Sequence, residues 1–121
     1  MRSIKKAPWI IGLLFAAGCA SVPAPTERIV SARAAIRSAS EVGATSTPAA
    51  ALHLKLAQNG FDDADRLVSE GENEAATSVL MRAESDAELA IVLSRAARAQ
   101  DTARQSEDLA VAQRQRAESS Q

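Results

Sequence analysis

Residues 73–97 read NEAATSVLMRAESDAELAIVLSRAA, and the apolar pattern of this stretch decides the fold. Its apolar positions are spaced alternately by four and three residues, so they fall on one face of an α-helix. These positions are Ala76, Leu80, Ala83, Ala87, Ala90, Ser94 and Ala97. No glycine or proline lies between Glu72 and Gln121 to interrupt such a helix. The sequence therefore predicts one long helix over about 73–117.

The apolar stripe fails after Ala97, because the next residues in phase are Asp101, Arg104 and Asp108. We expect residues 98–121 to form a polar helical extension that projects from the folded part and frays at its end. Large apolar side chains are rare in this extension. The residues predicted to contact a partner are Leu109, Val111, Arg104 and Arg114.

Two shorter helices are predicted before this one. The stripe Ile29, Ala32, Ile36, Ala39 predicts a helix over about 26–42, which Pro25 or Thr26 opens and Gly43 ends. The stripe Ala50, Leu54, Ala57, Phe61, Ala64, Val68 predicts a coiled-coil-like helix over about 48–70.

The ends of the second helix carry recognisable signals. Thr47 is predicted as its N-cap, with Pro48 at the first helical position, and Gly71 ends it. Ser69 and Glu72 have the spacing of a capping box for the next helix. Gly60, inside the second helix, is expected to weaken it by about 1 kcal/mol relative to alanine.

The predicted fold class is therefore all-α. Helices 48–70 and 73–117 form an antiparallel helical hairpin, and helix 26–42 lies alongside to complete a three-helix bundle. The hairpin domain covers residues 26–97. Most stripe positions are alanine, which brings helices close together but buries little area.

The N-terminal segment predicts export. Residues 10–20, IIGLLFAAGCA, follow a short basic head. The apolar run is shorter than the ~20 residues that a membrane-spanning helix needs. A basic start, a short apolar core and small residues at the exit are typical of a cleaved signal peptide, here residues 1–18.

Ala16, Ala17 and Gly18 precede Cys19, the only cysteine of the chain. This run resembles the lipobox of bacterial lipoproteins, which implies that Cys19 carries a diacylglycerol thioether with fatty acyl chains such as palmitate. Residues 19–25 are then the lipidated cysteine and a Pro-rich tether. By the same resemblance, Ala20 implies sorting to the outer membrane, facing the periplasm. An ordinary cleavage before Ser21 is the alternative, and it would discard the cysteine.

Charge and composition argue against several function classes. Three of the 14 basic residues lie in residues 1–18, which leaves 11 basic against 15 acidic residues, a net charge of −4. A mildly acidic domain is a poor partner for nucleic acid. Phe61 is the only aromatic residue after the signal segment. The usual lining of a small-molecule pocket is therefore missing, and we expect no small-molecule substrate.

No residue pattern predicts catalysis, a metal or a cofactor. Acidic residues gather in the segment 61–74, but without the spacing of a calcium loop, so we expect a solvated hairpin end. His53, the only histidine, is expected to face solvent from a position beside the apolar stripe of its helix. Glu84 and Glu88 are expected to form a like-charge pair on an exposed face. We therefore expect a protein that is not an enzyme.

Three segments together carry a family resemblance: AIRSASEVGA (35–44), TPAAALHLKLAQ (47–58) and GENEAATSVLMRAESDAELA (71–90). They resemble the alanine-rich bacterial lipoprotein family known as domain of unknown function DUF4398, over about residues 29–93. Two residues depart from the family pattern. Thr47 stands before Pro48, where the family has alanine, and Val42 stands where the family often has alanine. The resemblance implies an envelope lipoprotein and transfers no catalytic residue.

The expected function is that of a lipid-anchored, non-enzymatic helical protein of the bacterial envelope. It would act as a periplasmic spacer or adaptor that docks another envelope protein or a second copy of itself. The alternative is a small periplasmic chaperone-like binder that holds a client in an Ala/Leu helical groove.

Overall fold

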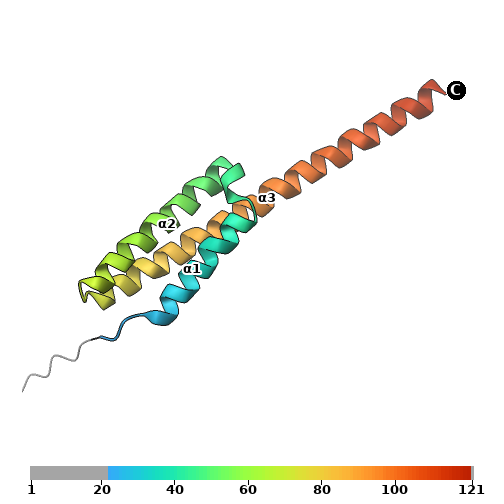
Figure 1. The fold of residues 1–121 in the computed structure, drawn as a ribbon. Coiled ribbons are helices and arrows are strands. Elements are labelled where there is room, and N and C mark those ends of the chain that lie inside the picture. Colours follow the sequence, from blue (N-terminus) through green and yellow to red (C-terminus); the bar gives the residue numbers. More distant parts are fainter. Residues whose placement is uncertain (1–21, 121) are drawn as a thin grey trace, which may run out of the picture.

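The computed structural model describes residues 22–120, and every regular element in that part of the chain is helical. The elements are α1 (Thr26–Glu41), the short 3-10 helix η1 (Ala44–Ser46), α2 (Pro48–Ser69) and α3 (Asn73–Ser119), shown in Figure 1. The predicted all-α class is confirmed. The predicted signal peptide lies outside the described residues, as do Ala16, Ala17, Gly18 and Cys19.

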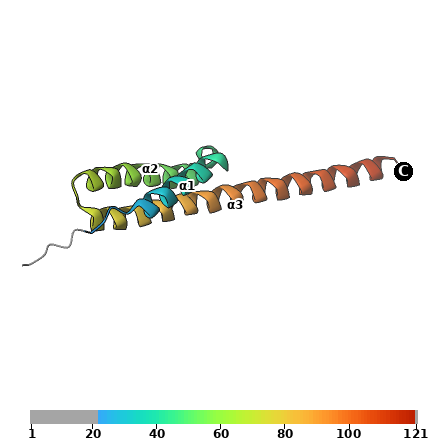
Figure 2. The same ribbon diagram turned by 60° about the horizontal axis from the view of Figure 1, so that its bottom comes forward.

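α1 and α2 pack against the first half of α3, and the axes of all three helices are roughly aligned. α2 runs antiparallel to α3, and α1 lies beside α3 and runs parallel to it (Figures 1 and 2). α3 then continues alone for about half its length, straight away from the other helices. The predicted hairpin with a projecting C-terminal helix is confirmed, and α3 continues to Ser119, two residues beyond its predicted end.

The core is made almost entirely of alanine. Twelve apolar residues are buried, and all except Ala44 belong to the predicted stripes. They are Ala32, Ala39, Ala44, Ala50, Leu54, Ala57, Ala64, Ala76, Leu80, Ala83, Ala87 and Ala90. The periodicity of the sequence therefore identified the buried face of each helix.

Gly60 helps to bring α2 close to α3. A Cβ atom built at this position would lie 3.3 Å from the Cβ atom of Ala83, which is tighter than an ordinary van der Waals contact. The glycine thus has a packing role between the two helices in addition to its cost in helix propensity.

The connections between helices follow most of the predicted signals. Gly43 after α1 and Gly71 after α2 have φ of +77° and +82°, in the region that favours glycine. Thr47 is the extended residue before Pro48, although its side chain makes no capping hydrogen bond.

The predicted capping box of Ser69 and Glu72 is wrong. The Ser69 hydroxyl donates to the carbonyl of Arg66 at 2.6 Å, within the last turn of α2. Glu72 is the N-cap residue of α3, and its side chain makes no capping bond. Because α2 extends through Ser69, that side chain is already used at the end of one helix and cannot begin the next.

Candidate docking surface

The projecting half of α3, residues 98–119, is here called the arm. Nearly all of its side chains are exposed, and its two largest apolar residues, Leu109 and Val111, are 65% and 48% exposed. An α-helix rises by about 1.5 Å per residue, so this segment of 22 residues is about 33 Å long. The arm therefore offers a long helical surface that the rest of the described chain, residues 22–97, leaves uncovered.

The four predicted contact residues of the arm do not form one patch. Leu109 and Val111 are separated by about 200° around the helix, so they lie on opposite sides. Arg104 lies seven residues before Val111 and shares its side, and it forms a long ion pair of 3.9 Å with Asp101. Leu109 and Val111 cannot both be central in the contact with a single partner helix.

The arm begins at a defined junction with the body. Ser94 is the last buried residue of α3, and its hydroxyl donates to the carbonyl of Ala90 at 2.7 Å. Arg98 lies over Gly43, because a Cβ atom at Gly43 would be 2.9 Å from the Arg98 Nη2 atom. Arg98 thus covers the end of α1 before α3 leaves the body.

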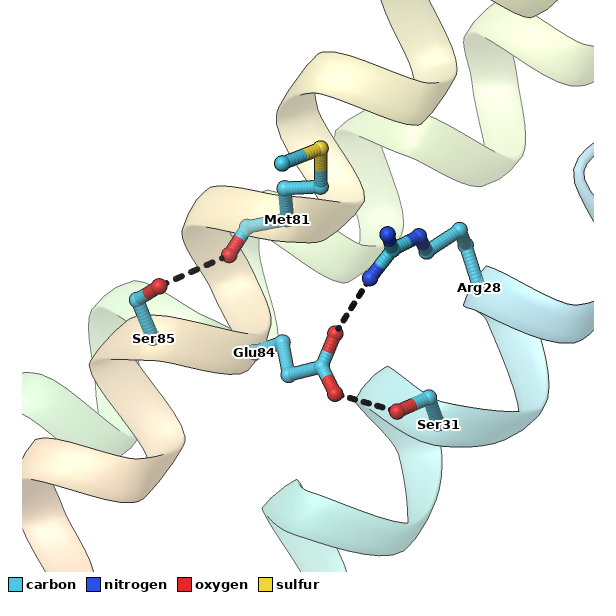
Figure 3. A network of polar contacts seen from close by, with 5 residues as sticks. All are labelled: Arg28, Ser31, Met81, Glu84 and Ser85. Carbon is cyan, nitrogen blue, oxygen red and sulfur yellow. Dashed lines mark hydrogen bonds and ion pairs between the residues drawn. The ribbon is translucent and has the colours of Figure 1, made fainter.

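A polar cluster joins α1 to α3, as Figure 3 shows. The Glu84 carboxylate accepts hydrogen bonds from the hydroxyl of Ser31 and from the guanidinium of Arg28, the latter at 3.5 Å. The predicted exposed pair of Glu84 and Glu88 is therefore wrong, because Glu84 is half-buried on the side of α3 that faces α1.

A second polar contact joins α2 to α3. The Nδ1 atom of His53 lies 2.8 Å from an Oδ1 atom of Asp86, and the two side chains are only 27% and 22% exposed. The expectation that His53 faces solvent is wrong. His53 does lie beside its buried stripe, as expected, because it precedes Leu54. Asp86 likewise precedes Ala87, so each side chain flanks the buried face of its helix.

Sequence reasoning missed a second apolar stripe on α3. Ser85, Leu89 and Val92 begin it, and it continues along the arm with the same alternation of four and three residues. We call this set the back face, because it points away from α1 and α2. All its members are exposed except Ala110, which is half-buried, and the full set is Ser85, Leu89, Val92, Ala96, Ala99, Ala103, Ser106, Ala110, Gln113 and Ala117.

The acidic segment 61–74 has ordinary surface features. Asp62, Asp63 and Asp65 are exposed, and Arg66 forms an ion pair with Glu70 at 3.0 Å. Across residues 22–120, no three His, Cys, Asp or Glu side chains gather in a way that could hold a metal ion. Within the same range, no helix combines the length and apolarity needed to cross a membrane.

Comparison with known proteins identifies one family. Residues 27–106 match a family described as Domain of unknown function (DUF4398). This match covers the three-helix body and the first part of the arm, and it ends before Leu109. No curated protein and no solved structure matches the chain.

Proposed function

Because the chain belongs to the DUF4398 family, whose function is unknown, we propose a role from its geometry. The protein is a lipid-anchored, non-enzymatic component of the bacterial envelope that acts as a spacer or adaptor. Its three-helix body carries the arm, and the arm docks a protein partner. The observation that supports this proposal is the arm, most of which residues 22–97 leave uncovered.

The positions of the two ends of the described chain suit a spacer. The Asn73 side chain donates to the carbonyl of Val22 at 2.6 Å, so the tether leaves beside the start of α3. The C-terminus lies at the other end of the molecule (Figures 1 and 2). The 47 residues of α3 separate these ends by about 70 Å.

The anchor is part of the proposal. Lipidation of Cys19 after Ala16, Ala17 and Gly18 would attach at least two acyl chains, and two chains hold a protein stably on a membrane where one is marginal. Outer-membrane attachment facing the periplasm follows as the proposed location.

Replacement of Cys19 tests the anchor. We expect Cys19→Ala to abolish incorporation of radiolabelled palmitate and to release the protein from the membrane fraction. A wild-type chain that takes up no label and has Ser21 as its mature N-terminus would contradict lipidation.

The buried stripes favour an adaptor over the chaperone-like alternative. A client-binding groove would need the Ala/Leu face to be open. Leu54 and Leu80, the two large residues of that face, are only 3% and 1% exposed, because the helices cover one another. A client would have to separate the helices before it could bind there.

Truncation tests the docking role. A chain that ends at Ala97 should keep its folded body and its membrane attachment but lose its partner in crosslinking within intact cells. A chain that ends at Ala117 is the control and should retain the partner. If the shorter truncation keeps all crosslinked species, the arm is not the docking element.

A further inference from the structure

The back face of α3 is exposed and mostly apolar, and its polar members are Ser85, Ser106 and Gln113. Leu89 and Val92 are 41% and 59% exposed. The Ser85 hydroxyl donates to the carbonyl of Met81 at 3.0 Å (Figure 3), and that of Ser106 donates to the carbonyl of Thr102 at 2.9 Å. A partner helix could therefore cover both serines without stranding a donor.

The size of the back face suits a helix of similar length. From Ser85 to Ala117 it spans 33 residues, or about 50 Å. Together with the positions that flank it, it would supply nearly 20 residues on each side, close to the ~20–30 residues per partner of a stable interface. α3 itself has the required length and pattern, so a second copy can meet it face to face.

Charges at the two ends of the back face fix the direction of pairing. Glu88 flanks its first end, where Asp86 is already paired with His53 of α2, and Arg114 and Arg116 flank its last end. Arg82 and Glu118 lie just beyond the two ends. Parallel pairing would place the acidic ends of the two copies side by side and the basic ends side by side, so that like charges repel. Antiparallel pairing places the acidic end of each copy against the basic end of the other, so this favourable contact occurs twice. It also makes the two helix dipoles antiparallel, which is favourable.

We propose that the back face binds a second copy of this chain in antiparallel orientation, with the two-fold axis between Ala99 and Ala103. Val92 then faces Ala110 of the second copy, and Glu88 lies beside Arg116 of the second copy. This inference rests on the proposed docking role of the arm and names its partner. The arrangement is isologous, so each contact occurs twice and the assembly closes as a dimer.

Antiparallel pairing also separates the two tethers. Each tether leaves beside Asn73 of its own copy, and the two Asn73 positions are about 56 helical residues apart, or about 85 Å. A dimer that is anchored at both tethers therefore lies along the membrane surface. Its role as a spacer is then to separate two anchors along the membrane, and its length sets their spacing.

Disulfide trapping tests the orientation. Full-length chains carrying Cys19→Ser, in a mild nonionic detergent, receive either Val92→Cys or Ala110→Cys. We expect a mixture of the two to form the mixed disulfide rapidly, and each variant alone to form little, because like positions lie about 27 Å apart. Rapid dimers of Ala110→Cys alone would indicate parallel pairing, and the absence of any interchain disulfide would also overturn the proposal.

Charge reversal tests the pairing of the ends. Glu88→Arg or Arg116→Glu should each weaken the dimer about tenfold in sedimentation equilibrium, and the double variant should recover the original affinity. The matched control is Asp108→Arg, because Asp108 lies on the side of α3 opposite the back face. Equal weakening by the control, or no recovery in the double variant, would contradict the arrangement.

Photocrosslinking in cells separates this inference from the proposed function. A photoreactive phenylalanine analogue replaces Leu109 in the full chain, at the edge of the back face. A product of twice the chain mass is expected and supports the second copy. A product with a different protein would retain the adaptor role but overturn the inference. No product at all would contradict both.

Discussion

The substitution Leu54→Ala measures how much the few large side chains of the alanine-rich core contribute to the free energy of unfolding. Leu54 is 3% exposed and lies in a cluster with Ala39, Ala44, Ala50 and Ala90, against which Ile36, Ile91 and Leu93 also pack. Removal of a buried leucine side chain leaves a cavity and typically costs about 2–5 kcal/mol. The small neighbours cannot fill the space, so we expect about 3 kcal/mol.

The matched control lies two residues earlier on the same helix. Leu52 is 58% exposed, so Leu52→Ala makes the same chemical change without a cavity and should alter the stability by less than about 0.5 kcal/mol. Since 1 kcal/mol corresponds to about 4–8 °C for a domain of this size, Leu54→Ala should lower the Tm by about 12–24 °C. Thermal unfolding followed by circular dichroism measures both. Equal losses from the two variants would refute the assigned faces of α2.

Two further predictions concern the connections and the junction of α1. Gly43→Ala and Gly71→Ala should each destabilise the fold by about 1–2 kcal/mol, because alanine is strained at positive φ. Gly43→Ala should cost more in chemical denaturation, since it also displaces Arg98, and Arg98→Ala should remove the difference. Glu84→Ala should cost about 1–2 kcal/mol, because it leaves Ser31 and Arg28 without their acceptor. Hydrogen exchange should then accelerate mainly in α1, and uniform acceleration across all helices would contradict a local role.

Helical periodicity predicted the helices and their buried faces because both are local properties. The alternation of four and three residues at Ala76, Leu80 and Ala83 is enough to define the face that packs, and each such residue is buried. The end of the packed region was predicted for the same reason, since a charge at Asp101 replaces an apolar residue in the same phase.

The contacts between helices could not be predicted in the same way. The pairing of His53 with Asp86 depends on the register of α2 against α3, because the two residues are 33 positions apart. Glu84 was wrongly predicted to be exposed, because the apolar stripe of α3 does not show on which side of it α1 packs. The back face was missed because its alanines are indistinguishable in composition from those of the core.

Register is the property that an alanine core leaves least determined. If α2 slid along α3 by one heptad, most alanines would still meet alanines, so the apolar contacts alone discriminate weakly between registers. The same slip would separate His53 from Asp86 by about 10 Å and would move Gly60 away from Ala83. An exposed polar pair contributes only about 0–1 kcal/mol to stability, but it exists in one register only. The half-buried polar contacts of α3, with His53 on one side and with Ser31 and Arg28 on the other, therefore select one arrangement among packings that burial alone would leave nearly equal.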